Sequence, residues 1–157
     1  MKALIIYCSD YRGNTEKIAS EIASKIDAEL LNIKDFKNDS IHIEEYTLIG
    51  FGSGIYRETM SHKLYGIADR LDLGGKDTFV FSTSGVGMKF YNSKLTKLLK
   101  KKGAIVLGSF ACKGSFIASE FTDKKTFNLF GKMSQGHPDK SDMENAERFI
   151  LELINTI

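Results

Sequence analysis

The sequence predicts an α/β protein with a three-layer, doubly wound architecture and a five-stranded parallel sheet of strand order 2-1-3-4-5. Continuous apolar runs, such as residues 3–7, are typical of strands buried on both faces of a parallel sheet. These runs alternate with helix-periodic stretches, which favours right-handed crossovers and this strand order. The length of 157 residues suits one domain, and we expect a single domain over 1–157.

Each element follows from a local pattern. The helix over 14–26 has an apolar stripe that includes Ile18 and Ile22, and the last helix has Ser141 as N-cap with Glu144 three residues later. The expected strands are 3–7, 28–33, 46–51, 78–82 and 104–110, and the expected helices are 14–26, 60–71, 93–102 and 143–157. The sequence does not decide whether residues 35–45 form a helix. Residues 113–140 have little periodicity, which indicates a lid or an excursion with short helices.

Charge and cysteine content narrow the class of protein. There are 22 basic and 20 acidic residues, a balance too even to indicate nucleic-acid binding. The apolar run at the start is too short for a signal peptide or a membrane span, so we expect a cytoplasmic protein without membrane insertion. Cys8 and Cys112 should lie about 14 Å apart, three strand positions at ~4.8 Å each, too far for a disulfide. Cys8 is expected in the core, and a redox role for Cys112 would require a lowered pKa.

Polar loops follow the first, third and fourth expected strands, at the edge where open parallel sheets bind ligands. After the first strand comes Ser9-Asp10-Tyr11-Arg12-Gly13-Asn14-Thr15, directly before a helix. Free N–H groups and the dipole at a helix start favour an anion, and Arg12 can add a charge-assisted contact to a phosphate. The alternative is an ordinary strand-to-helix turn with Gly13 or Asn14 as N-cap.

The sequence lacks the motifs of several other kinds of site. The first loop is neither a P-loop nor a dinucleotide fingerprint. Ser84 lacks the preceding glycine of a hydrolase elbow, and Asp10 alone does not provide the paired acids of a receiver domain. His42, His62 and His137 lie on separate segments without metal-ligand spacing, so we expect no metal site.

Five segments in register resemble the flavodoxin family. They are residues 7–19 with Gly-Asn-Thr-Glu at 13–16, residues 52–56, residues 79–85, Cys112-Lys113-Gly114, and Gly136-His137-Pro138 followed by Asp142. The resemblance runs nearly end to end. It implies a flavodoxin-like fold and a non-covalently bound FMN.

The resemblance also implies which residues hold FMN. The phosphate would lie against Ser9, Asp10, Tyr11, Arg12, Gly13, Asn14 and Thr15. The isoalloxazine ring would lie between two further loops, formed by Ser53, Gly54, Ile55, Tyr56, Thr83, Ser84, Gly85, Val86 and Gly87. Tyr56 is the candidate to stack on the ring. Asp10 and Arg12 replace hydroxyl residues of the usual family loop, so Asp10 should turn away from the phosphate or pair with Arg12.

The function expected from this resemblance is electron transfer. The protein would cycle one electron between a reductase and an acceptor enzyme, as a monomer or weak dimer and without a substrate of its own. Two alternatives stay open: an FMN oxidoreductase acting on a quinone, porphyrinogen or other organic acceptor, and a binding module that has lost its flavin. Many flavodoxins are strongly acidic, whereas this chain has a net charge of +2. Lysines at 94–102 favour a solvated helix face, with docking of an acidic redox partner as the second interpretation.

Overall fold

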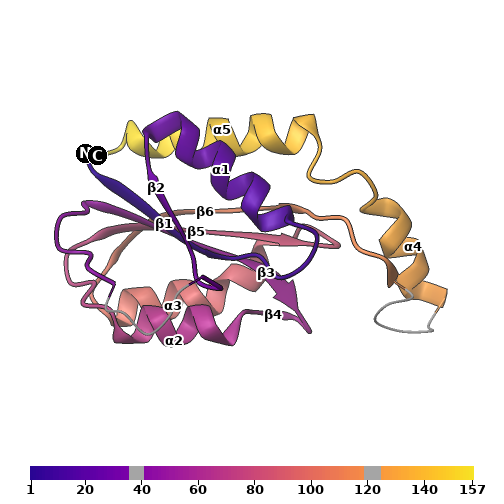
Figure 1. Cartoon of the computed structure of the whole chain (residues 1–157), viewed down its shortest axis with the longest axis horizontal. Helices are drawn as coiled ribbons and strands as arrows, with labels where there is room; N and C mark the ends of the chain where they lie inside the picture. The colour runs from indigo at the N-terminus through magenta and orange to yellow at the C-terminus, as the bar shows by residue number, and fades with distance from the viewer. Residues whose placement is uncertain (36–40, 119–124) are drawn as a thin grey trace.

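The computed structural model describes residues 1–35, 41–118 and 125–157 of the chain (Figure 1). The strands are β1 (Ala3–Cys8), β2 (Glu29–Asn32), β3 (Leu48–Tyr56), β4 (Thr59–Met60), β5 (Asp77–Ser84) and β6 (Ile105–Lys113). The helices are α1 (Asn14–Ile26), α2 (His62–Arg70), the 3-10 turn η1 (Lys89–Asn92), α3 (Ser93–Lys101), α4 (Lys125–Met133) and α5 (Lys140–Ile154).

The sheet has the predicted topology. Its strands run in the order β2-β1-β3-β5-β6, all parallel, and the short β4 adds to β3 in the antiparallel sense. With β4 set aside, this is the 2-1-3-4-5 order of a doubly wound sheet. Helices α1 and α5 cover one face, and α2 and α3 cover the other, so the three-layer architecture is confirmed (Figure 1).

Strand β1 lies in the middle of both cores, which explains its continuous apolar run. All six of its residues are buried. Leu4 and Ile6 pack with α2 and α3, whereas Ile5 and Tyr7 pack with α1 and α5, because successive side chains of a strand point to opposite faces. A helix on each face therefore requires an apolar residue at every position.

Two glycines of β3 make room for two phenylalanines of β5. A Cβ on Gly50 would lie 2.3 Å from Cζ of Phe79, and a Cβ on Gly52 would lie 2.0 Å from Cζ of Phe81. The two rings stack with centroids 6.2 Å apart and lie over the bare backbone of β3. These glycines serve packing on the α1–α5 side of the sheet rather than a turn.

The third strand is longer than the predicted 46–51. It continues to Tyr56 and turns back into β4, where Tyr56 pairs with Thr59. Arg57 and Glu58 between them have φ of 47° and 67°, and two consecutive positive φ angles are what a two-residue type I′ hairpin requires. The sequence offers neither glycine nor asparagine there, so local turn chemistry did not indicate the hairpin.

The last helix starts earlier than predicted. Its N-cap is Asp139, whose side chain accepts a hydrogen bond from the N–H of Asp142, while Asp142 accepts one from the N–H of Asp139. This reciprocal pair is a capping box, two residues before the predicted Ser141–Glu144 box, which is therefore wrong.

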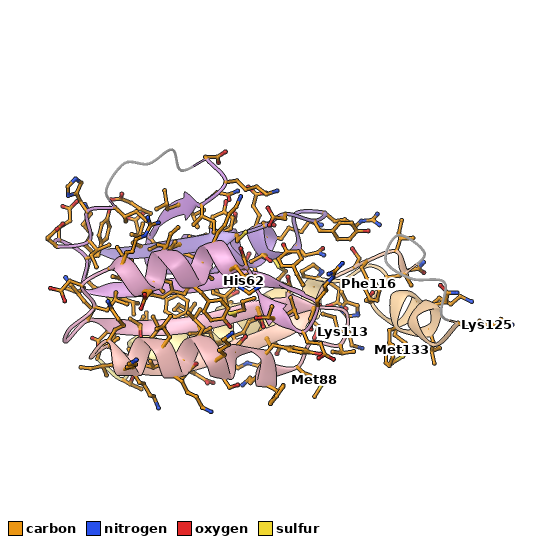
Figure 2. The ribbon with its side chains drawn as sticks, turned by 90° about the horizontal axis from the view of Figure 1, so that it is seen from below. His62, Met88, Lys113, Phe116, Lys125 and Met133 are labelled. Atoms are coloured by element: carbon orange, nitrogen blue, oxygen red, sulfur yellow. The ribbon has the colours of Figure 1, made fainter. Side chains whose placement is uncertain are left out.

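The described parts of 35–45 and 113–140 refine the two undecided regions. Residue 35 and residues 41–45 contain no helix, and residues 36–40 lie outside the description. Helix α4 forms within 113–140 and extends beyond the end of the sheet, with Leu129 and Met133 exposed (Figures 1 and 2). The expected excursion with a short helix is thus observed. None of the described helices has the length and apolar content needed to span a membrane.

Candidate functional site

The three predicted loops meet at one edge of the sheet. Strands β1, β3 and β5 end level with one another, since Cys8 pairs with Ser53 and Gly54 pairs with Thr83. The hydroxyl oxygens of Thr15 and Thr83 lie 2.9 Å apart in the interior and tie the first loop to the third. This edge lies at the topological switch point, where open α/β sheets bind ligands.

The first loop presents unpartnered backbone donors. Arg12 and Gly13 have φ of 55° and 66°, and Gly13 is the N-cap of α1, without a side-chain capping bond. Within the described residues, the N–H groups from Arg12 to Thr15 have no hydrogen-bond acceptor. Successive N–H groups in such a turn, at the positive end of a helix dipole, form a concave site for an anion.

The carboxylate of Asp10 is held away from these donors. It lies 3.1 Å from Nζ of Lys34 and accepts a hydrogen bond from the thiol of Cys8 at 3.1 Å. Burial raises the pKa of Asp10, but the bonds from Cys8 and Lys34 outweigh it, and the pKa is lowered. The partner of Asp10 is therefore Lys34 rather than Arg12, whose guanidinium is exposed and lies 6.0 Å from the ring centroid of Tyr11.

Tyr56 folds back onto the first loop. Its phenol oxygen accepts a hydrogen bond from the N–H of Asp10 at 3.0 Å, and a Cβ on Gly54 would lie 2.8 Å from that oxygen. Burial raises the pKa of Tyr56 to about 12, and the negative charge of Asp10 adds to the rise. The ring thus lies between the hairpin and the first loop, as part of the wall of the site.

Two predicted residues of the second loop face the interior. Ser53 is fully buried, where its hydroxyl donates to the carbonyl of Gly54 and accepts from the N–H of Ser61. Ile55 pairs with Met60 and packs against the core under α2. Both side chains fix the β3–β4 hairpin, and their predicted place beside the isoalloxazine ring stays a prediction.

The third loop is closed by a segment that follows β6. Ser84 accepts a hydrogen bond from the N–H of Gly87, which has a φ of 65°, and Val86 between them is partly buried. A Cβ on Gly85 would lie 2.2 Å from the ring of Phe116, so the aromatic side chain rests directly on this glycine.

Sequence reasoning missed the contacts made by residues 114–117. The amide of Asn14 donates to the carbonyl of Ser115, and the N–H of Ile117 donates to the phenol oxygen of Tyr11. The segment therefore buttresses the first loop from more than a hundred residues away. The glycine at position 114 was the one sign of this contact in the sequence. The structure explains it, because a Cβ there would lie 2.8 Å from the side-chain amide of Asn14.

The thiol of Cys112 lacks the properties of a reactive cysteine. It is buried, and burial raises its pKa, with the charges of Asp142 and Asp139 adding to the rise. Reactive cysteines have lowered pKa values. Both cysteines are free, with Cys8 in the core as predicted.

His137 joins the capping box of α5. Its Nδ1 lies beside an Oδ2 of Asp142 and 3.7 Å from Oδ2 of Asp139, so the three side chains could surround a cation. The same Oδ2 of Asp142 accepts the N–H of Asp139, however, and the cluster is accounted for as the start of the helix.

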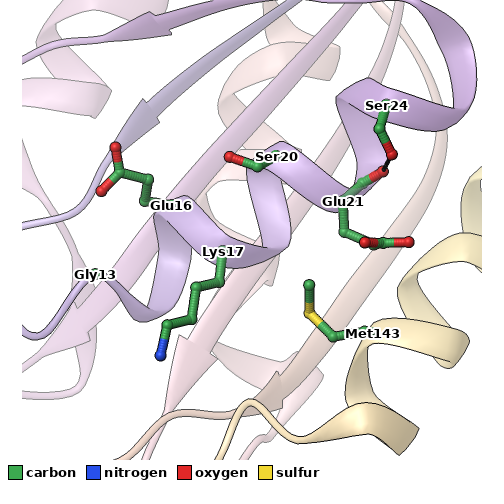
Figure 3. A pocket seen from close by; sticks show the side chains of 7 residues that line it. All are labelled: Gly13, Glu16, Lys17, Ser20, Glu21, Ser24 and Met143. Carbon is green, nitrogen blue, oxygen red and sulfur yellow. Dashed lines mark hydrogen bonds between the residues drawn. The ribbon is translucent and has the colours of Figure 1, made fainter.

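A pocket lies between α1 and α5 and reaches Gly13 of the first loop (Figure 3). Its lining includes Lys17, Ser20, Glu21 and Met143. Met143 belongs to α5, whereas the other lining residues lie on α1 or, in the case of Gly13, in the first loop directly before it. The pocket mixes acidic, basic and apolar groups without a convergent polar set, so its geometry indicates no ligand.

The fold defines a class: a doubly wound α/β protein with three polar loops at the switch point of its sheet. The family model described as "Flavodoxin domain" matches residues 4–141, and the chain therefore belongs to the flavodoxin family. This confirms the resemblance seen in the sequence. Membership of this family supports FMN as the cofactor.

The chain is also similar in sequence or in structure to the following known proteins. An uncharacterised protein of Methanocaldococcus jannaschii is 37% identical over 156 residues, covering 98% of this chain and 99% of that protein. Oxidised flavodoxin 1 from Bacillus cereus has a TM-score of 0.69 at 24% identity, covering 100% of this chain and 99% of that one. A flavoprotein from Lactobacillus acidophilus in complex with FMN has a TM-score of 0.56 at 25% identity, covering 69% of this chain and 91% of that one.

Proposed function

We propose that this protein binds FMN and carries single electrons between a reductase and an acceptor enzyme. The observation that carries the proposal is the first loop, where the N–H groups of residues 12–15 have no acceptor among the described residues and Asp10 is tied to Lys34. A loop of this kind suits a phosphate dianion, because its donors are already oriented and the charge of Asp10 is paired. The carboxylate of Glu16 also lies beside the loop, 3.7 Å from the position of a Cβ on Gly13, and it accepts a hydrogen bond from the phenol of Tyr7.

The chain's residues divide into three roles toward FMN. Arg12 and the N–H groups of the first loop would hold the phosphate, with the Ser9 hydroxyl, which accepts from the N–H of Glu16, completing the turn. Tyr56 and the loop at 84–87 would border the isoalloxazine ring and exclude water from it. FMN supplies the electron chemistry, while the protein sets its orientation and surroundings.

A flavodoxin-like oxidoreductase acting on a quinone or another organic acceptor is the second candidate. It is favoured by Phe116, a partly buried aromatic side chain resting on Gly85 at the loop that would border the ring. Such a side chain could orient a planar substrate. We also propose that the protein is cytoplasmic, that it is a monomer or a weak dimer, and that residues 1–157 form one domain.

Binding is tested first, by titrating the purified chain with FMN and, separately, with riboflavin. Arg12→Glu should weaken FMN binding by at least tenfold and leave riboflavin binding unchanged, because riboflavin lacks the phosphate. Glu152, exposed near the end of α5, provides a remote control as Glu152→Gln. No binding at saturating FMN would overturn both candidates and favour the binding module without flavin.

The FMN-loaded protein is needed to distinguish an electron carrier from an oxidoreductase. Stepwise anaerobic reduction should give an EPR signal near half-reduction if single electrons are carried. Direct two-electron reduction together with rapid turnover of NAD(P)H and a quinone would favour the oxidoreductase.

A further inference from the structure

The cations of this protein are distributed unequally between the two faces of the sheet. Helices α2 and α3 carry Lys63, Arg70, Lys94, Lys97, Lys100 and Lys101 against the single acid Asp69. On the other face, Lys25 of α1 pairs with Glu21 and with Glu147 of α5, and Lys140 pairs with Glu144. The uncompensated positive charge therefore belongs to the α2–α3 side.

Part of that charge lies at the edge where the three loops meet. Arg57 at the hairpin tip, Lys63 at the start of α2, and Lys89 and Lys94 at the start of η1 and α3 are all exposed. None of these four forms an ion pair within the described residues. Lys94 lies over the ring of Tyr65, with Nζ 5.0 Å from the centroid, which positions its charge at this end of α3. We call these four cations the basic rim.

Apolar side chains stand exposed beside the basic rim. Phe90 is 72% exposed and Met88 is 52% exposed, although both follow directly on the third loop. Figure 2 shows Met88 near Lys113, at the end of the sheet that is nearer α4. Burying an exposed aromatic side chain is a common source of binding energy at protein interfaces, and cations around it favour an acidic partner.

We propose that the basic rim, with Phe90 and Met88, is the docking surface for a redox protein whose own surface is acidic. This rests on the proposed function, because the rim lies beside the second and third loops, which would border FMN, on the α2–α3 side of the sheet. Electron-transfer encounters bury little area, below about 1,200 Å², so a short rim with one aromatic anchor is sufficient. The positive charge of this surface is opposite in sign to that of the strongly acidic members of the family.

The test uses the FMN-loaded chain and an acidic plant-type ferredoxin as probe. The dissociation constant for oxidised ferredoxin is measured by calorimetry, and the rate of FMN reduction by reduced ferredoxin is measured by stopped flow. Between about 20 mM and 300 mM salt, the dissociation constant should rise at least tenfold and the rate should fall at least tenfold, because salt screens the charge of the basic rim.

Two matched variants separate the rim from the overall charge. Lys89→Glu/Lys94→Glu should weaken ferredoxin binding and slow the reaction at least tenfold at low salt. Lys100→Glu/Lys101→Glu makes the same charge change at the far end of α3 and should have less than a threefold effect. Reduction by photoreduced deazaflavin, and the FMN dissociation constant, should be the same in both variants.

Phe90→Ala tests the apolar anchor. It should weaken ferredoxin binding at least threefold even at high salt, with FMN affinity unchanged. Equal effects of the two double variants, salt independence, or a loss of FMN affinity in Phe90→Ala would overturn the proposal while leaving FMN binding established. Binding of a labelled single-stranded oligonucleotide through Lys89 and Lys94, without any effect on ferredoxin, would also overturn it by assigning the rim to nucleic acid.

Discussion

The phenol oxygen of Tyr56 accepts a hydrogen bond from the backbone N–H of Asp10, across 46 residues of sequence and at 3.0 Å. The bond joins the β3–β4 hairpin to the first loop, and the phenol is buried enough to raise its pKa to about 12. Tyr56→Phe should therefore cost about 1 kcal/mol of unfolding free energy near neutral pH, measured by urea unfolding.

Burial of the Tyr56 phenol, which raises its pKa, makes the stability of the fold depend on pH. Since the folded pKa of Tyr56 exceeds the ordinary value of 10, its neutral form stabilises the fold fully below pH 10, and that contribution is lost as the pH rises through about 12. Over this pH range the wild type should lose stability relative to Tyr56→Phe. A difference that stays constant from pH 9 to 12 would contradict the assignment.

The Asp10–Lys34 ion pair should protect phosphate binding. Lys34→Ala releases the Asp10 carboxylate, which then repels a phosphate in the first loop, so FMN affinity should fall several-fold at low salt. Adding Asp10→Asn should restore it. Flavin fluorescence titration measures both, and Lys132→Ala, an exposed lysine of α4, is the control. Identical affinities in Lys34→Ala and the wild type would show that the pair has no electrostatic role.

The buried contact between Thr15 and Thr83 is expected to be strongly non-additive. Either threonine changed to valine leaves the other hydroxyl unpaired in the interior, at a cost of about 1–3 kcal/mol. The double variant should cost clearly less than the sum, because it removes both polar groups. A double-mutant cycle by urea unfolding gives the coupling, and simple additivity would argue against the bond.

Gly52 and Gly66 are a matched pair for steric fit. Gly52→Ala places a methyl group 2.0 Å from the ring of Phe81 and should destabilise the protein by about 3 kcal/mol or more. Gly66→Ala, in α2 with nothing within 4 Å of the new Cβ, should stabilise it by up to about 1 kcal/mol. Thermal unfolding of both variants suffices, and tolerance of Gly52→Ala would mean that Phe81 moves freely.

The two candidate caps of α5 can be compared directly. Asp139→Ala removes the observed cap and should lower the thermal midpoint by about 2–4 °C. Ser141→Ala, at the position that local sequence favours, should change it by less than about 1 °C. The reverse order of effects would restore the predicted cap.

Local pattern was sufficient for most of the fold. The continuous apolar run of β1 and the stripe of α1 indicate their structure without reference to the rest of the chain, and alternation of such elements leaves few topologies. The hairpin tip at Arg57 and Glu58 was not predictable, because positive φ there is imposed by the pairing of Tyr56 with Thr59 rather than by the residues themselves.

The site was predictable only in outline. The three loops could be placed at one edge because parallel strands end together, but the partners of individual side chains could not. Asp10 pairs with Lys34 from the neighbouring strand's loop, and Asn14 binds Ser115 from the far end of the chain. Such contacts depend on register and side-chain direction, which a single sequence does not contain.

The two cysteines have a consequence for the working life of the protein in air. Reduced flavins react with oxygen to give hydrogen peroxide, and peroxide attacks thiolates. Cys8 and Cys112 lie on opposite faces of the sheet, both buried, and burial raises the pKa of each thiol, to about 11 for Cys8. The chain should therefore pass through many rounds of reduction and aerobic reoxidation with neither sulfur converted to a sulfenic acid.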